Sequence, residues 1–365
     1  MIIGAGLAGA ISAYTLSRTG LAVALVRNEG PRYELGESLP PLANRYLQDL
    51  GLAEIVRESG SMPSYGTRSA WGTSQLLERN FITDADGHGW HLNKWALVNR
   101  LQEAACSEGA LIIGAANATF EILKGGWKVL INDQPPDGSV RGHYLIDATG
   151  RPSRQTKAKY LTYDWLVAAV GILAASAWRG EHFTYVEAFE WGWWFANPMP
   201  NGQVAIALLT DSDVARRLKI AQPGVWRQLL MQTSHITDAV SDMRFVGQGI
   251  RILPATSIRV ECPVRSYFYV IGDAAGTYDP ISALGITSIL AASEKLVKVI
   301  SSENNEEGTS TYREWFHTHY SSYLARWVGT YDTERRWPQS AFWSRRHAVA
   351  AALKTPSNRQ LSAGI

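Results

Sequence analysis

The stretch Val270-Ile271-Gly272-Asp273-Ala274-Ala275-Gly276, continuing through Asp279-Pro280 to Gly285-Ile286, decides the fold of this chain. A second glycine fingerprint, Gly4-Ala5-Gly6-Leu7-Ala8-Gly9, lies near the opposite end of the 365 residues. The N-terminal pattern is typical of a turn that holds a pyrophosphate. An aspartate in a tight turn before a helix start suits the sugar-alcohol chain of a flavin. Together the two fingerprints predict one long cofactor held at both ends, FAD.

Each N-terminal glycine has an expected role. Gly4 allows the tight turn, Gly6 lets the backbone approach the pyrophosphate, and Gly9 lets the helix pack on the strand. The helix that follows, read over residues 10–16, offers free N–H groups and a positive dipole end to phosphate. Alone, the pattern also fits a mere turn between a strand and a helix.

The next strand, Leu21 to Val26, should end in an acidic residue that binds the ribose hydroxyls. That position falls on Arg27, and the nearest carboxylate is Glu29. Either the strand slips by a residue or two, or the ribose is held differently. An arginine here also fits the 2′-phosphate of NADP, although the C-terminal fingerprint favours flavin.

Composition is ordinary for a soluble globular protein, at 46% hydrophobic and 19% charged residues with a net charge of +2. No long basic run points to nucleic acid. Cys106 and Cys262 make no disulfide framework, and the eight histidines show no metal-ligand spacing, so we expect no metal site. The longest apolar run, Trp165 to Trp178, is too short to span a bilayer, and no secretory signal is visible. We therefore expect a cytoplasmic protein without a membrane span.

The chain changes character after Arg154. Residues 165–172, 183–189, 192–196 and 203–210 read as successive strands, with turns expected at Asn197-Pro198 and Asn201-Gly202. Strands without intervening helices predict an antiparallel sheet. The parallel pattern returns at Tyr267 to Ile271, so the second domain is inserted into the first.

The expected fold class is α/β, with a Rossmann-like FAD-binding domain, an inserted antiparallel β-sheet substrate domain and a helical C-terminal region. The predicted boundaries are 1–64, 91–153 and 247–300 for the FAD-binding domain, 65–90 and 154–246 for the substrate domain, and 301–365 for the C-terminal region.

The ordered motifs resemble a known family. Gly4-x-Gly6-x-x-Gly9, Asp147 to Ser153, and Gly272-Asp273 with Asp279-Pro280 are similar to the FAD-dependent monooxygenases of the aromatic-hydroxylase fold. Gly36-Glu37-Ser38 and the stretch Gly192-Trp193 to Pro198 resemble the branch that contains the flavin-dependent tryptophan halogenases. The resemblance covers roughly residues 1–300, and it implies fold and cofactor more strongly than substrate. The expected FAD contacts are Gly4, Gly6, Leu7, Ala8, Gly9, Arg27, Glu37, Ser38, Gly272, Asp273, Pro280, Gly285 and Ile286.

Departures from the halogenase pattern argue against halogenation. Those enzymes carry a Gly-Trp-x-Trp-x-Ile-Pro motif, where this chain has Phe195 for the second tryptophan and Asn197 for the isoleucine. Their essential lysine should lie near Tyr65 to Arg68, where there is none. The segment that matches their Asp-Pro-Leu-Glu-Ser-Thr-Gly is Asp279-Pro280-Ile281-Ser282-Ala283-Leu284-Gly285 in this chain. Ser282 replaces the glutamate, and Ala283 and Leu284 replace the two hydroxyl residues.

A closer match is to flavoproteins that mature quinone-cofactor enzymes. Gly72, the stretch Gly89 to Lys94, Glu334 to Pro338, and Phe342 to Arg346 resemble those proteins, which hydroxylate a partner's tryptophan during cysteine tryptophylquinone formation. The leading hypothesis is thus an FAD-dependent monooxygenase acting on an electron-rich aromatic ring, such as a tryptophan in a protein or peptide substrate. The C-terminal arginines read most simply as a solvated face, or as a docking surface for such a partner.

The electron donor is expected to be external. The sequence shows no second glycine-rich unit for NAD(P)H, and Thr149 stands where many NADPH-using hydroxylases carry aspartate. We therefore expect O2 as co-substrate and an external reductant or flavin reductase.

No catalytic acid or base stands out in the sequence. Aromatic walls suit a flat ring, but tryptophans of the central segment also fit a plain core role. Glu37 could instead interact with a helix dipole, and His91 reads as a structural histidine. The substrate-pocket candidates are Trp193, Trp194, Phe195, Tyr65, Arg68 and Glu37.

Two other functions stay open. Reductases of the geranylgeranyl type share the glycine fingerprints, but they transfer hydride and need an apolar tunnel for a polyprenyl chain. A non-catalytic, FAD-containing maturation factor would bind its partner without changing the partner's mass.

Overall fold

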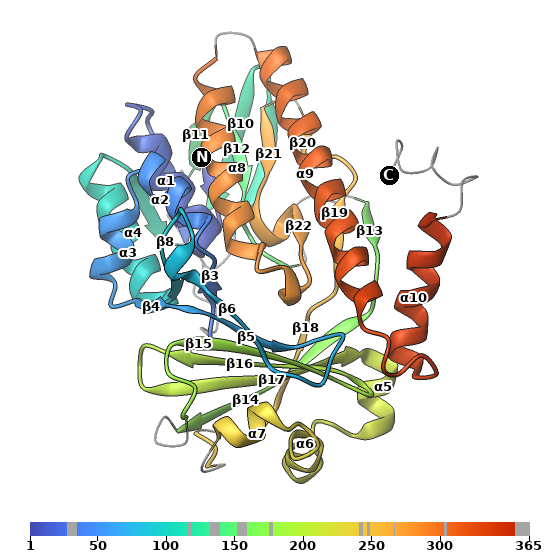
Figure 1. Ribbon diagram of the computed structural model, residues 1–365. Coiled ribbons are helices and arrows are strands. Elements are labelled where there is room, and N and C mark those ends of the chain that lie inside the picture. The colour runs from blue at the N-terminus through green and yellow to red at the C-terminus, as the bar shows by residue number, and fades with distance from the viewer. Residues whose placement is uncertain are drawn as a thin grey trace.

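The structure, a computed structural model, describes residues 1–27, 35–114, 118–131, 139–151, 159–174, 178–240, 244–246, 249–265, 267–302 and 305–354. Figure 1 shows two layers of β-structure, with the N-terminal helices and α8 around the upper sheet and a larger sheet below. The α/β fold class predicted from the sequence is confirmed. The cofactor fingerprints lie in the upper part, and the run of four strands lies in the lower part.

The upper sheet is mostly parallel. β1 pairs in parallel with β2 on one side and with β12 on the other, and β21 adds to β12 as the Tyr267–Ile271 pattern predicted. Ligands of such sheets bind beyond the carboxyl ends of the strands, where the strand order reverses. The strand order in the described residues is β20 (Val264–Arg265), β21 (Phe268–Val270), β12 (Leu145–Asp147), β1 (Ile2–Ile3), β2 (Ala24–Arg27) and β8 (Leu111–Gly114).

The lower sheet contains the four predicted strands as antiparallel neighbours. β5 joins it by pairing in parallel with β15. β18 also pairs with β14, although the sequence-based boundary at residue 247 placed it in the FAD-binding domain. The order is β18 (Arg251–Pro254), β14 (Leu166–Ala174), β17 (Gln203–Asp211), β16 (Gly192–Met199), β15 (Phe183–Phe189), β5 (Gly66–Ala70) and β6 (Leu77–Asn80).

The expected turn at Asn197-Pro198 is wrong, because both residues lie inside β16. Pro198 pairs with Val204 of β17, while the ladder to β15 ends at Ala196. A proline lacks the N–H that a central strand position needs, so it is tolerated where one neighbouring ladder has already stopped. The turn at Asn201-Gly202 is confirmed, with Gly202 at a φ of +74°.

Different helices pack against the two sheets. In Figure 1, α6 (Pro223–Leu230) and α7 (His235–Ala239) lie beneath the lower sheet, and α5 (Ser212–Leu218) lies beside its right-hand end. The C-terminal region forms α9 (Asn305–Thr333) and α10 (Ala341–Lys354). In Figure 1, α9 descends from beside α8 in the upper part to the lower sheet, so it spans both layers.

Short elements complete the described chain. The short helices are α2 (Ala43–Asp49), α3 (Ala53–Glu58), η1 (Phe81–Thr83), η3 (Gly272–Ala274) and η4 (Pro280–Ser282). One small sheet contains β3 (Ser38–Leu39), β7 (Gly89–His91) and β4 (Met62–Ser64), and a second contains β11 (Ser139–Gly142), β10 (Gly126–Ile131) and β9 (Ala118–Leu123). A third contains β13 (Tyr160–Thr162), β19 (Ile258–Val260) and β22 (Gly276–Thr277).

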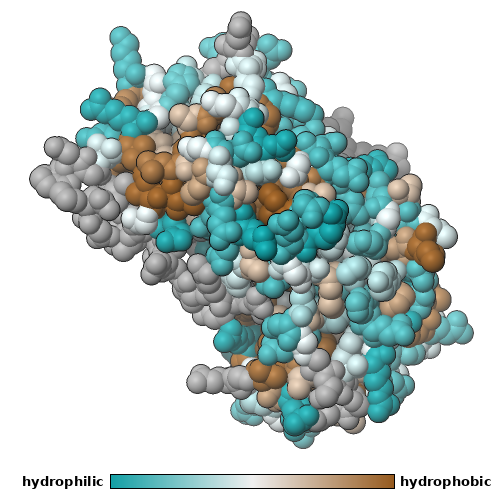
Figure 2. All heavy atoms as spheres, turned by 90° about the vertical axis from the view of Figure 1, so that its left-hand side faces the viewer, coloured by the Kyte–Doolittle hydropathy of each residue, from teal (hydrophilic) through white to brown (hydrophobic). Residues whose placement is uncertain are grey.

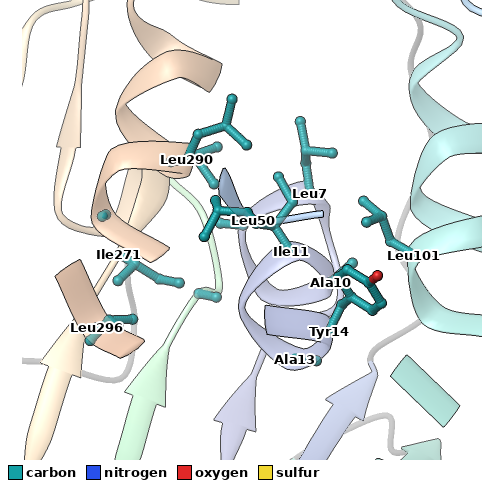
Figure 3. Packing of buried hydrophobic residues seen from close by; sticks show 14 of the residues in the cluster. Leu7, Ala10, Ile11, Ala13, Tyr14, Leu50, Leu101, Ile271, Leu290 and Leu296 are labelled. Carbon is teal, nitrogen blue, oxygen red and sulfur yellow. The ribbon is translucent and has the colours of Figure 1, made fainter. Parts of the chain in front are cut away.

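The upper core is built around α1 (Leu7–Ser17), in which every residue is buried. Figure 3 shows Leu101 of α4 (Lys94–Ser107) on one side of α1 and Leu290 and Leu296 of α8 (Gly285–Ile300) on the other. Burying α1 between two helices fixes its N-terminal end against the sheet, and the first glycine fingerprint is placed with it.

The outer face around these helices is mostly hydrophilic, with small apolar groups between the polar side chains (Figure 2). Among the described residues, no helix is both long and apolar enough to cross a membrane. Nor does this part of the chain gather three or more His, Cys, Asp or Glu side chains in a way that could hold a metal ion.

Candidate functional site

A cavity of about 1200 Å³ lies between the upper sheet's carboxyl edge and one face of the lower sheet. Residues 3–8, 148–151, 278–281 and 283–286 line it from the cofactor-binding side, and residues 35–40 line it further along. Side chains of the lower sheet form the opposite wall: Thr67, Ala168, Val170, Thr184, Val186, Trp193, Phe195, Ala207, Leu209 and Leu253.

The N-terminal glycines fit their predicted roles. Gly4 has a φ of +99°, and a Cβ there would lie 2.4 Å from the carbonyl oxygen of Ala148. A Cβ on Gly9 would lie 1.8 Å from the carbonyl oxygen of Gly4, so the helix packs against the strand turn as closely as atoms allow. Gly6 has no such neighbour within 4 Å and faces the cavity. This open backbone at the start of α1 fits a pyrophosphate.

The second fingerprint touches the first. Gly272 has a φ of +59°, and a Cβ there would lie 2.7 Å from the Cβ of Ala8. Asp273 lines the cavity and accepts a hydrogen bond from Arg151 at 3.0 Å. The first residues of α8, Gly285 and Ile286, also line the cavity. One continuous space thus contacts both glycine turns and two helix N-termini, as a long cofactor with a central pyrophosphate requires.

Gly9 and Gly272 form part of the two glycine turns but do not line the cavity. The other eleven expected FAD contacts all line it, namely Gly4, Gly6, Leu7, Ala8, Arg27, Glu37, Ser38, Asp273, Pro280, Gly285 and Ile286. Their roles in binding stay predictions.

Arg27 ends β2 at the cavity, where an acidic residue was expected. Its Nε is buried without a hydrogen-bond partner in the described part of the chain. The alternative carboxylate, Glu29, lies outside the described residues. An unsatisfied buried donor at a cavity wall fits contact with an oxygen-rich ligand group.

Asn197, one of the departures from the halogenase motif, supports the Gly36–Ser38 segment. Its Nδ2 donates to the carbonyl oxygen of Gly36 at 2.8 Å, and its Oδ1 accepts from Thr184 Oγ1 at 2.7 Å. Gly36 has a φ of +74°, and a Cβ there would lie 2.7 Å from that of Ala205. The lower sheet therefore holds the backbone that carries Glu37 and Ser38 into the cavity.

Two polar residues of the cavity were missed by the sequence interpretation. Lys94, the first residue of α4, forms an ion pair with Glu37 at 2.7 Å, and Gln102 donates to the carbonyl oxygen of Ala5 at 3.0 Å. Lys94 ends the stretch Gly89 to Lys94 noted in the sequence, and the Asn93 cap before it marks a helix start, but neither signal places it in a cavity. Glu37 thus has a lysine partner at the start of α4.

Strand alternation separates the aromatic candidates. Trp193 and Phe195 lie on the cavity side of β16, whereas Trp194 points to the other face and contacts Trp226 with ring centroids 5.0 Å apart. Successive side chains of a strand point to opposite faces, so the three could not all wall one cavity. Trp193 has no exposed surface, so it backs the wall behind the open space.

Tyr65 and Arg68 do not line the cavity either. Tyr65 stacks on His182, with ring centroids 5.3 Å apart, and is 46% exposed. Arg68 binds Glu78 at 2.9 Å and the Tyr185 hydroxyl at 2.9 Å on the sheet's other face. β5 presents Thr67 to the cavity, because the alternation along the strand places its neighbour Arg68 on the opposite face. Tyr65 precedes β5 and lies outside this pattern.

The C-terminal segment is tied to Gly72 by a buried carboxylate, that of Glu334. Glu334 has no exposed surface; it pairs with Arg336 at 2.6 Å and accepts from the Gly72 N–H at 2.8 Å. A Cβ on Gly72 would approach the carbonyl oxygen of Thr333 to 3.0 Å. For Arg336 and Arg346 the expected solvated face is therefore wrong, since both pair with buried carboxylates, Glu334 and Asp211.

His91 is the structural histidine expected from the sequence. It lies in β7 next to the cavity-lining Ser38, it is fully buried, and its Nε2 contacts the carbonyl oxygen of His182 at 3.0 Å. Burial lowers the pKa of His91 to about 4. The ring is therefore neutral in the folded protein at neutral pH.

We expect this histidine to make folding stability depend on pH. The unfolded chain binds a proton near pH 6.5 and the folded chain only near pH 4, so stability present above pH 6.5 is lost as pH falls towards 4. The contribution of His91 is as much as about 3 kcal/mol. Urea unfolding at pH 7.5 and 5 should show a smaller loss for His91→Gln than for the unchanged protein.

The control variant is His235→Gln. The His235 ring contacts the carbonyl oxygen of Ser74 at an exposed position of the fold. This variant should retain the full pH dependence. His319, whose pKa burial also lowers to about 4, accounts for a remaining slope in His91→Gln. Equal slopes in all three proteins would contradict the role of His91.

Comparison with known proteins agrees with this site. A family model described as "FAD binding domain" matches residues 1–326. The FAD-dependent oxidoreductase LodB of Marinomonas mediterranea is 26% identical over 360 residues, covering 96% of this chain and 97% of that relative.

Solved structures share the fold. The myxobacterial chondrochloren halogenase CndH superposes with a TM-score of 0.81 at 19% identity, covering 98% of this chain and 89% of that one. The peptidyl tryptophan dihydroxylase QhpG, essential for tryptophylquinone cofactor biogenesis, superposes with a TM-score of 0.76 at 19% identity, covering 95% of this chain and 77% of that one. With the cavity and its two glycine turns, these matches confirm FAD as the cofactor. The chain belongs to the FAD-binding-domain family, it shares the fold of the flavin-dependent halogenase CndH, and it is an FAD-dependent oxidoreductase.

Proposed function

We propose that this protein is an FAD-dependent monooxygenase that hydroxylates an electron-rich aromatic ring, a tryptophan of a partner protein during quinone-cofactor biogenesis. The observation that carries the proposal is the composition of the wall opposite the cofactor turns. Apolar and aromatic side chains of the lower sheet form most of it, with Phe195 at its surface and Trp193 behind. Such a wall suits a flat aromatic substrate.

Reduced FAD supplies the activation of O2, and the protein must orient the ring and keep water away. Ala168, Val170, Ala207 and Leu209 present small apolar groups to the cavity, which leaves room for a ring and excludes water. Thr67 and Thr184 add hydroxyl groups near the β5 side. No acid or base is strictly required, which agrees with the lack of a catalytic dyad among the residues named above.

The residues beside the α8 start argue against halogenation. Where the halogenase segment has a glutamate, Ser282 uses its hydroxyl to donate to the carbonyl oxygen of Asp279 at 2.7 Å. Ala283 and Leu284 follow, so neither supplies a hydroxyl. The cavity does contain Lys94, but its ammonium is held by Glu37. If bromide is incorporated into a peptide, Lys94 is therefore the first residue to substitute.

The relatives favour a macromolecular substrate. QhpG acts on peptidyl tryptophan, and Glu334 and Arg336, which stand in a segment that resembles the maturation flavoproteins, form a buried ion pair here. We further propose that O2 is the co-substrate and that electrons come from an external reductant or a flavin reductase.

The decisive experiment reduces the FAD-loaded protein without oxygen and then adds O2 with a tryptophan-containing peptide. Mass spectrometry should find the peptide heavier by one oxygen atom after one reduction of the flavin, and by a second oxygen atom only after the flavin is reduced again. Reduction should proceed with dithionite or a flavin reductase and not with NADPH alone. The same reaction with bromide should give the same oxygenated product.

Other outcomes would replace the proposal. A brominated peptide would identify a halogenase, and Lys94→Met would then test the cavity lysine. Slow reoxidation with saturation of a polyprenyl substrate would identify a reductase. An unchanged peptide bound to a flavin that does not react with O2 would identify a non-catalytic maturation factor.

A further inference from the structure

Three successive turns of α9 converge on Asp279. Tyr323, Trp327 and Tyr331 are spaced four residues apart, which places their side chains on one face of the helix. The Asp279 N–H donates to the Tyr323 hydroxyl at 2.9 Å, while Trp327 Nε1 and the Tyr331 hydroxyl donate to Asp279 Oδ2 at 2.9 and 2.7 Å. The helix therefore holds one residue of the cavity wall by three hydrogen bonds.

Asp279 in turn shapes the segment that lines the cavity. Its side chain has no exposed surface, and Oδ1 accepts from the Ile281 N–H at 3.0 Å, which caps η4. The chain then passes through Ala283, at a φ of +51°, into Gly285 at the start of α8. A buried carboxylate that receives N–H and O–H donors is a rigid anchor, because each lost donor would leave a desolvated charge.

The Tyr331 hydroxyl also reaches the opposite wall. It accepts a hydrogen bond from Trp193 Nε1 at 2.8 Å while it donates to Asp279. Trp193 belongs to β16 of the lower sheet, and Asp279 precedes the segment that runs to α8. One buried hydroxyl, from a helix outside both sheets, thus ties the two walls of the cavity together. Trp71 packs against both rings, with centroids 6.1 Å from Trp193 and 5.5 Å from Tyr331.

We infer that Tyr331 is a positioning residue that fixes the separation between the cofactor-bearing wall and the substrate-bearing wall. The inference rests on the proposed monooxygenase function, in which an oxygen atom passes across this space. A displacement of about 1 Å at such a distance costs on the order of 100-fold in rate. Tyr331 acts through Trp193 and Asp279 and does not touch the reacting atoms.

The test compares Tyr331→Phe with Tyr312→Phe. Tyr312 lies on the same helix and is equally buried. Tyr312→Phe loses one buried hydrogen bond, from the hydroxyl to the carbonyl oxygen of Val270 at 3.0 Å, and does not touch the bridge between the two walls. Val270 does not line the cavity. The first measurement is the visible circular dichroism of bound FAD, which depends on how the walls hold the ring and needs no substrate.

Tyr331→Phe should change this spectrum, and Tyr312→Phe should leave it as in the unchanged protein. With a tryptophan peptide, Tyr331→Phe should also divert turnover to free hydrogen peroxide, lowering the oxygenated product per flavin oxidised by about tenfold or more. The KM for the peptide should change less than this product yield. Tyr312→Phe should keep both values.

A second variant separates this role from general damage to the fold. Trp193→Phe removes the N–H donor of the same bridge and should reproduce the change in circular dichroism, and the double variant Trp193→Phe/Tyr331→Phe should add nothing further. An unchanged spectrum in Tyr331→Phe, or an equal change in Tyr312→Phe, overturns the inference. Failure to oxygenate any peptide overturns the proposed function and leaves the spectral comparison intact.

Discussion

Gly9→Ala should abolish stable FAD binding. The added Cβ would lie 1.8 Å from the carbonyl oxygen of Gly4, which is backbone and cannot rotate away. Gly4 itself is held at a φ of +99° against Ala148, so the fingerprint can relieve the clash only by moving as a whole. Such overpacking costs about 2–3 kcal/mol, equivalent to about 30- to 150-fold in affinity. Flavin content after purification and FAD titration of the apoprotein measure it.

The matched control is Gly224→Ala in α6, where an added Cβ meets no atom within 4 Å. This change should keep full FAD affinity, and it should stabilise the helix by up to about 1 kcal/mol. If Gly9→Ala binds FAD as tightly as Gly224→Ala does, the close packing of α1 on the first turn is not what forms the site.

Asp211→Ala should destabilise the fold by about 3–5 kcal/mol, because it leaves a buried cation without its partner. Arg346 and Asp211 are each 4% exposed in their side chains and are joined at 3.0 Å. The guanidinium also lies 3.5 Å from the centre of the Phe342 ring, in an apolar part of the C-terminal core. The free energy of unfolding in urea, followed by circular dichroism at 222 nm, measures the loss.

Asp213→Ala is the control for this prediction. Asp213 pairs with Arg345 at 2.7 Å, but its side chain is 54% exposed, so the loss should be at most about 1 kcal/mol. Similar losses of stability in the two variants would contradict this prediction. They would show that the ion pairs of Arg345, which also contacts Asp211 at 2.9 Å, matter as much for stability as the buried pair of Arg346 with Asp211.

Local patterns predicted much of the fold. The glycine spacing at 4–9 placed the first turn and α1, and the apolar run at Tyr267 to Ile271 placed the return of the parallel sheet. The antiparallel order of the four central strands also followed, since no helical segment separates them. These features depend on residues near one another in the chain, where backbone geometry and hydrophobic periodicity act directly.

The candidate site was predicted less evenly. Phe195 lines the cavity and Trp193 lies behind it on the same side of β16, whereas Trp194, Tyr65 and Arg68 do not face it. Their roles stay predictions. A motif locates a strand, but which alternate side chains face the cavity depends on how that strand packs in the sheet. The turn predicted at Asn197-Pro198 was wrong because the end of a neighbouring ladder cannot be read from the sequence. Proline is tolerated in a strand only at such an end.

The sequence by itself determined the cofactor and the fold class, because both rest on glycines whose short side chains permit particular backbone turns. Only the tertiary structure decided that Asn197 holds Gly36, that Lys94 pairs with Glu37, and that α9 brings Tyr331 between Trp193 and Asp279. Those contacts join residues from 52 to 161 positions apart, and such pairs carry no local signal, since hydrogen bonds between distant side chains form only when packing brings their elements together.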